Sequence, residues 1–124
     1  MTQTGGEPVG CLDEGPLVSR RLTNAEIATI AKALGHPVRL EILELFHIRC
    51  PRTAGDIAAE IPLAQSTVSN HLHILRDAGV IRTFRSGTRI WHCLNRSVIT
   101  GVADAIGNLT RRAGNSWMPS GAHS

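Results

Sequence analysis

The sequence predicts a mainly α-helical domain with one small β-hairpin. Between residues 23 and 79, aliphatic side chains recur at helical spacing. Two short β-branched and aromatic stretches follow, and helical spacing then returns up to residue 109. Gly and Pro residues mark the boundaries of these stretches. The expected element order is therefore α-α-α-α-β-β-α.

The length and composition indicate a single domain with tails. The chain has 124 residues, and we expect a flexible arm at 1–18, a folded domain at 19–110 and a disordered tail at 111–124. With two Trp, two Phe and no Tyr, the core must be aliphatic. The net charge of +3 suits a polyanionic partner without requiring one. No secretory signal or membrane span is visible, and three scattered cysteines indicate cytosolic thiols, so we expect a cytoplasmic protein.

Local signals set the expected bounds of the first three helices. Thr23 to Glu26 has the pattern of a capping box, and Gly35 suits the end of that helix. The predicted buried stripe of this helix is Ile27, Ile30, Ala31 and Leu34. Pro37 suits the first position of a second helix, which is apolar around most of its surface and should be buried. Pro51 disfavours helix at Cys50, and a short third helix is expected at about 53–60.

The fourth helix is expected to begin at Gln65, after a tight turn at 61–64. Val68, Leu72 and Leu75 form one apolar stripe, so the neutral polar side chains of the first turns point elsewhere. Such donors and acceptors match the base edges on the floor of a DNA major groove. Helix, short turn and polar-faced helix form the pattern of a helix-turn-helix. The predicted DNA-reading residues of this helix are Gln65, Ser66, Thr67, Ser69, Asn70, His71 and His73.

Residues 80–84 and 89–94 are expected to form two strands, joined by a turn at 85–88. Arg85 and Arg89 would then extend from the hairpin beside the recognition helix, where they can reach phosphates or a minor groove. The last helix is expected at about 96–109, with Asn95 as its N-cap. One small domain cannot cover the apolar stripes of both terminal helices, which favours a dimer.

Three motifs stand out in the chain, at residues 32–43 (KALGHPVRLEIL), 65–72 (QSTVSNHL) and 75–81 (LRDAGVI). Together they resemble the ArsR/SmtB family of winged helix-turn-helix repressors. The resemblance covers about residues 22–109. It implies a homodimer formed by the first and last helices, bound to a double-stranded DNA operator. It also implies release when an inducer binds, often a metal or metalloid. His36 and Asn70 depart from the family pattern, which commonly has Asp and His there.

The resemblance directs attention to the cysteines as sensor residues. Some metal sensors of the family pair an arm cysteine with one just before the third helix, and this chain has Cys11 and Cys50 at those places. Residues 11–17 resemble the arm of an arsenite-sensing subgroup that carries two adjacent arm cysteines, although Gly10 precedes Cys11 here. As(III) and Sb(III) prefer thiolates, and a third ligand would be water or a small thiol. The expected ligands are Cys11 and Cys50. His47, three residues before Cys50 on the expected helix face, could ligate a harder ion such as Zn(II), so Zn(II) or Cd(II) is the less favoured inducer.

Several alternatives stay open at this stage. Cys11 and Cys50 can instead form a disulfide or persulfide, which would make the chain a redox or reactive-sulfur sensor. A repressor with no metal site is a further alternative, and Cys93, which alternates with Trp91, is expected only to pack. An enzyme with Cys50 as nucleophile and His47 as base lacks an orienting third group. A non-specific architectural DNA binder would usually carry more positive charge.

Overall fold

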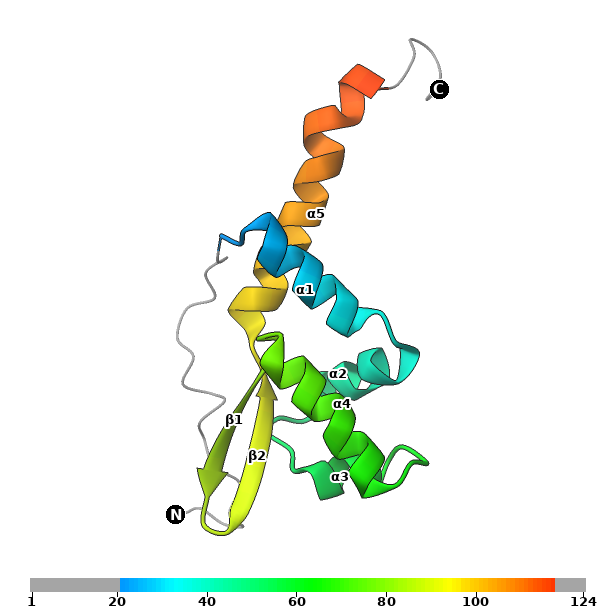
Figure 1. Ribbon diagram of the computed structural model, residues 1–124, viewed down its shortest axis with the longest axis vertical. Helices are drawn as coiled ribbons and strands as arrows, with labels where there is room; N and C mark the ends of the chain where they lie inside the picture. The colour runs from blue at the N-terminus through cyan, green and yellow to red at the C-terminus, as the bar shows by residue number, and fades with distance from the viewer. Residues whose placement is uncertain (1–20, 118–124) are drawn as a thin grey trace.

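The computed structural model describes the backbone of residues 21–117 and the side chains of residues 21–111. Figure 1 shows a helical body with a two-stranded hairpin at one end and a long last helix that extends away from the opposite end. The element order confirms the predicted α-α-α-α-β-β-α arrangement of a winged helix-turn-helix. The elements are α1 (Asn24–Leu34), α2 (Pro37–Ile48), α3 (Ala54–Ala58), α4 (Gln65–Asp77), β1 (Ile81–Ser86), β2 (Arg89–Leu94) and α5 (Arg96–Trp117).

The first two helices begin at residues that satisfy their free backbone N–H groups. Thr23 Oγ1 accepts from the Glu26 N–H, and the Glu26 carboxylate accepts from the Thr23 N–H, which confirms the predicted capping box. Pro37 occupies the first turn of α2, as predicted. The cap of α2 is His36, whose Nδ1 accepts from the Val38 N–H at 3.2 Å. Sequence reasoning missed this cap because His is not among the usual N-cap residues.

A single aliphatic core lies between α4 and the elements packed around it. Val68, Leu72 and Leu75 are buried, which confirms the predicted stripe of α4. They pack with buried aliphatic residues of α1, α2, α3, β1 and α5. Because the whole apolar side of α4 is used in this core, the helix holds its polar side outward. The other buried members of the cluster are Ile30, Ala33, Ile42, Phe46, Ile57, Ile61, Val80, Ile81, Val98 and Val102.

Glycines with positive φ mark the two sharp changes of direction after α4. Gly79 has φ +84° directly after the helix, and Gly87 has φ +65° at the hairpin turn. The strands pair antiparallel, with Ile81 opposite Leu94 and Ser86 opposite Arg89. The turn therefore contains only Gly87 and Thr88, and the predicted turn at 85–88 was too long. The hairpin is tighter because the ladder continues through Arg85 and Ser86.

Three further expectations about the helices were wrong. Ala33, not Ala31, completes the buried stripe of α1. Helix α2 is buried mainly through Ile42 and Phe46, while Leu40 is 48% exposed, because the core lies on one side of the helix only. Helix α5 runs to Trp117 rather than ending near Leu109, so the tail predicted from residue 111 overlaps it. The arm predicted at 1–18 lies outside the described residues.

Candidate DNA interface and cysteine site

Most of the predicted reading residues of α4 lie on its outward side. Gln65, Ser66, Asn70 and His73 are exposed, and Thr67 and Ser69 are half-buried. None of these six side chains is among the buried core residues. In Figure 1 the start of α4 lies at the same end of the molecule as the hairpin turn. The structure therefore presents neutral donors and acceptors beside the hairpin, where a DNA groove can receive them.

His71 is the exception among the predicted reading residues. Its Nδ1 accepts a hydrogen bond from Arg39 Nε at 3.2 Å, and its ring lies 4.7 Å from the His36 ring. Burial, together with the charges of His36 and Arg39, lowers the pKa of His71 below its usual 6.5. Arg39 also donates to Ala33 O, so the α1–α2 junction, α2 and α4 are joined at this point. This geometry gives His71 a positioning role inside the protein.

The hairpin exposes both predicted arginines. Arg85 and Arg89 are exposed on neighbouring strands, and the Arg89 guanidinium lies 5.1 Å from the ring centroid of Trp91. Stacking on this ring limits the conformations of Arg89 while leaving its donors available. Burial raises the pKa of Asp56, but hydrogen bonds from Thr53 and the positive charges of Arg49 and Arg89 outweigh burial, so the pKa is lowered. Arg89 therefore lies close enough to α3 for its charge to act on Asp56 of that helix.

A groove of about 580 Å³ separates α4 from the hairpin. Its described lining includes His73 and Arg76 from α4, Arg89 and His92 from the hairpin, and several hydroxyl groups, and it includes no acidic side chain. Such a lining favours an anion such as a DNA phosphate. Sequence reasoning missed Arg76 and His92, although Arg76 follows His73 at helical spacing, which was the available signal.

His92 is the most strongly perturbed titratable group of the groove. Its side chain is buried, and its Nδ1 has no hydrogen-bond partner in the described structure. Burial, followed by the charges of His73 and Arg76, lowers the pKa of His92 to about 4. The imidazole is therefore neutral at neutral pH, and the positive charge of the groove comes from its arginines.

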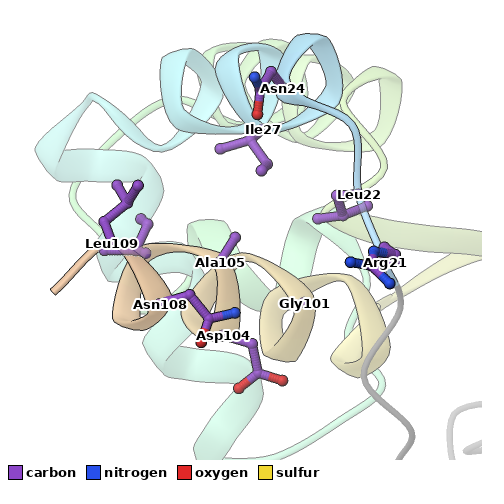
Figure 2. A pocket seen from close by; sticks show the side chains of 10 residues that line it. Arg21, Leu22, Asn24, Ile27, Gly101, Asp104, Ala105, Asn108 and Leu109 are labelled. Carbon is purple, nitrogen blue, oxygen red and sulfur yellow. The ribbon is translucent and has the colours of Figure 1, made fainter. Parts of the chain in front are cut away.

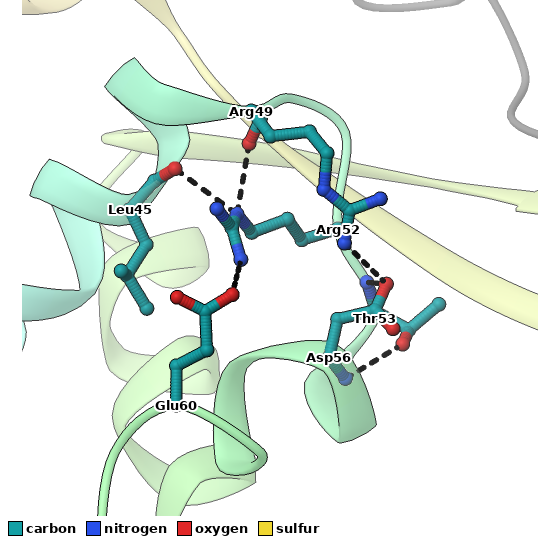
Figure 3. A network of polar contacts seen from close by, with 6 residues as sticks. All are labelled: Leu45, Arg49, Arg52, Thr53, Asp56 and Glu60. Carbon is teal, nitrogen blue, oxygen red and sulfur yellow. Dashed lines mark hydrogen bonds and ion pairs between the residues drawn. The ribbon is translucent and has the colours of Figure 1, made fainter.

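A buried arginine holds the segment between α2 and α3. Arg52 is 1% exposed, and its Nε donates to the carbonyl oxygens of Leu45 and Arg49. Its Nη1 lies 2.7 Å from the Glu60 carboxylate, as Figure 3 shows. The Arg52 backbone exchanges two hydrogen bonds with His92, of 3.0 and 2.8 Å. This residue therefore fixes the connection relative to α2, α3 and β2 at once.

The cysteines occur in this same region. Cys50 is half-buried between α2 and α3, Cys93 is buried in β2, and both are disulfide-bonded rather than free thiols. Helix α2 ends at Ile48, so the expected common helix face of His47 and Cys50 does not exist, and His47 is exposed. Across the described side chains, no three His, Cys, Asp or Glu residues form a group that would hold a metal ion. The predicted ligand Cys11 lies outside these residues.

Helices α1 and α5 form an open apolar surface on another side of the molecule. The groove between them has a volume of about 610 Å³. Figure 2 shows its aliphatic side chains together with the polar side chains at its edge, which are Arg21, Asn24, Asp104 and Asn108. Ile106 is 51% exposed and Leu109 is 70% exposed. Large aliphatic residues exposed together in this way are typical of an interaction surface.

Comparisons with known proteins identify the family. A model of a helix-turn-helix domain matches residues 34–83. The transcriptional repressor SdpR of Bacillus subtilis is 34% identical over 86 residues, which are 69% of this chain and 94% of SdpR. The arsenical resistance operon repressor of Staphylococcus aureus is 34% identical over 85 residues, covering 68% of this chain and 77% of that repressor. The chain belongs to the ArsR family.

A solved structure agrees with the ArsR-family fold. The homodimeric winged helix-turn-helix DNA-binding domain from Mycobacterium bovis matches with a TM-score of 0.56 at 23% identity, over 76% of this chain and 85% of that domain. ArsR-family membership makes the chain a DNA-binding transcriptional repressor and not an enzyme. Among the described residues, no helix has the length and apolar character needed to span a membrane.

Proposed function

We propose that this ArsR-family repressor binds a palindromic operator as a homodimer and is released when As(III) or Sb(III) binds its cysteine thiols. The main support for operator contact is that the polar side of α4 faces outward beside the arginines of the hairpin. Gln65, Ser66, Thr67, Ser69, Asn70 and His73 would contact base edges, and Arg85 and Arg89 would contact the backbone or minor groove.

The apolar surface of α1 and α5 supports the homodimer. Ile106 and Leu109 are exposed around the groove between these helices, and a second copy would bury them. The M. bovis domain of the same fold is homodimeric. A two-fold dimer would place two α4 helices on half-sites about 34–36 Å apart, which is one turn of DNA.

Two observations support a soft metalloid as the inducer. The S. aureus relative is a repressor of an arsenical resistance operon. Cys50 lies at the entrance to the helix-turn-helix, so a ligand bound to its sulfur acts directly on α3 and α4. With Cys11 as the second ligand, binding would tie the arm to this connection and change the spacing of the two α4 helices. Zn(II) also binds thiolates but takes four ligands, and the exposed His47 is no longer placed to supply one of them, so the cysteines suit As(III) or Sb(III) better.

A redox response is the second candidate, because Cys50 and Cys93 are both disulfide-bonded. In that case oxidation by a peroxide would form the disulfide, and two thiols and one peroxide would give one disulfide and two waters. The oxidised and reduced proteins would then differ in operator affinity without any metalloid.

The test is a titration of the complex between the reduced protein and its operator, a palindrome selected from random duplexes. We expect a sharp preference over scrambled duplex, and release by arsenite but not by peroxide. Equal affinity for scrambled duplex would exclude the operator function. Release by peroxide alone would favour the redox candidate, and Cys50→Ser should abolish the response in either case. Arg111→Gln, which leaves every cysteine in place, is the control.

A further inference from the structure

The groove between α4 and the hairpin has a buried imidazole in its wall. His92 is 8% exposed and lines this groove of about 580 Å³, and its Nδ1 has no hydrogen-bond partner in the described structure. Thr83 lies opposite His92 on the paired strand and lines the same groove. Since buried polar groups are nearly always hydrogen-bonded, an unpartnered imidazole in a groove wall indicates a place where a polar ligand can bind.

One face of α4 forms the opposite wall of the groove. Ser69, His73 and Arg76 follow one another at spacings of four and three residues, so they share this face, and all three line the groove. After burial, the charges of His73 and Arg76 are the next causes that lower the pKa of His92, so both groups lie near its ring. The described lining also includes Arg89 and no acidic side chain. Guanidinium, imidazole and hydroxyl groups gathered in this way suit the oxygens of a phosphate group.

Arg76 already has a partner in the next residue. Its Nε and Nη2 lie 3.2 and 3.1 Å from Asp77 Oδ1, and the two side chains are 45% and 71% exposed. Ion pairs that are this exposed contribute little to stability. Arg76 can therefore turn from Asp77 to a phosphate oxygen at small cost in free energy.

We propose that this groove binds a phosphate group, with Arg76 and His73 donating to its oxygens and the imidazole of His92 as a further donor. The group can belong to the operator backbone or to a free phosphate or phosphate ester, since all of these present the same oxygens. The volume of the groove lies in the range of small-ligand sites. The inference goes beyond the proposed function, because it involves neither a metalloid nor a cysteine and its first test uses no DNA.

The first test titrates inorganic phosphate into the full chain at constant pH and at constant ionic strength, which is balanced with chloride. The imidazole resonances of His73 and His92 are followed by NMR, and we expect both to shift saturably. Arg76→Gln should weaken phosphate binding by about 10-fold, because one charged donor is lost. Asp77→Asn removes the competing carboxylate and should strengthen it. Arg111→Gln, an exposed α5 change outside the groove lining, should match the wild type.

The second test separates the two sources of the phosphate group. Operator duplexes in which single phosphates are replaced by neutral methylphosphonates are bound to the wild type and to Arg76→Gln. If the operator backbone occupies the groove, one replacement should weaken wild-type binding by about 10-fold and add nothing to the loss in Arg76→Gln. Such a coupled position assigns the groove to the operator. Saturable phosphate binding without a coupled position assigns it to a free phosphate or phosphate ester.

The inference can fail independently of the proposed function. It is overturned if the shifts of His73 and His92 do not saturate, or are the same in Arg76→Gln, and no operator position is coupled to Arg76. Arg76 is half-exposed, so its replacement should leave the fold intact, and circular dichroism checks this for each variant. Saturable phosphate binding by a protein without operator preference would support this site and contradict the proposed function.

Discussion

Arg39 Nε lies 3.2 Å from His71 Nδ1, so the helix that presents polar side chains to solvent is hydrogen-bonded to α2. The same guanidinium donates to Ala33 O at 3.1 Å. One side chain therefore joins the α1–α2 junction to α4. Because a rotation of α4 would move every outward polar group together, this pair bears on the DNA contact as well as on stability.

Replacing Arg39 by Met should lower the free energy of unfolding by about 1–3 kcal/mol, since it leaves two acceptors without their donor. Operator affinity should fall too, because α4 is no longer held in place. Urea denaturation and fluorescence anisotropy measure the two effects. Lys32→Met, an exposed change on α1, should alter neither. An Arg39→Met protein as stable as the wild type would contradict the role of this pair.

His92 should make stability depend on pH. Its pKa is about 4 in the folded protein and about 6.5 when unfolded, so the unfolded chain binds more protons between these values. Stability should therefore fall as the pH drops from 6.5 to 4, by about 2–3 kcal/mol. His92→Phe should flatten this dependence, and the lowered pKa of His71 should leave a smaller slope of the same sign. Denaturation midpoints from pH 4 to 8 provide the measurement, and an unchanged slope in His92→Phe would rule the assignment out.

Arg52 and Glu60 should contribute unequally to the free energy of unfolding, although they form one ion pair. Arg52→Met leaves the carbonyl oxygen of Arg49 without its donor and removes one of the two donors to the Leu45 carbonyl oxygen, which should cost about 1–3 kcal/mol. Glu60 is half-exposed, so Glu60→Gln should cost less than about 1 kcal/mol. Thermal unfolding of both variants compares them. Equal losses would mean that the ion pair, and not the carbonyl bonds, is the dominant interaction.

Arg89 should contribute to binding without contributing to sequence preference. For Arg89→Gln, the slope of log affinity against log salt should fall by about 1, as expected for one lost phosphate contact. Affinity for operator and for scrambled duplex should fall by the same factor. Arg111→Gln on α5 removes the same charge away from the hairpin and serves as the control. A loss confined to the operator would instead indicate that Arg89 reads a base.

Ile106→Glu should produce a monomer. The substitution puts a charge into the apolar surface that α1 and α5 expose, and burying it in a dimer would be costly. Sedimentation should show half the mass, and operator affinity should fall because two half-sites are no longer bound together. Ala103→Glu adds the same charge at an exposed α5 position outside the groove lining. If Ile106→Glu stays dimeric, the α1–α5 surface is not the interface.

Much of the fold could be predicted because it follows from neighbouring residues. The capping box at Thr23 and Glu26, the first-turn Pro37 and the buried stripe of Val68, Leu72 and Leu75 depend on spacings of three to seven positions. Six of the seven predicted reading residues of α4 face outward for the same reason. These features needed no knowledge of distant segments.

The sequence by itself thus determined the element order, the polar side of α4 and the arginine-bearing hairpin. Only the tertiary structure decided that His71 contacts Arg39, that Arg52 is buried against three carbonyl and carboxylate groups, and that the segment of Cys50 adjoins that of Cys93. The physical reason is that helical and strand periodicity act over a few residues, whereas the Arg39–His71 and Arg52–Glu60 contacts and the pairing of the two cysteine segments join residues 8 to 43 positions apart. Such contacts form only when the aliphatic core closes and brings the separate segments together.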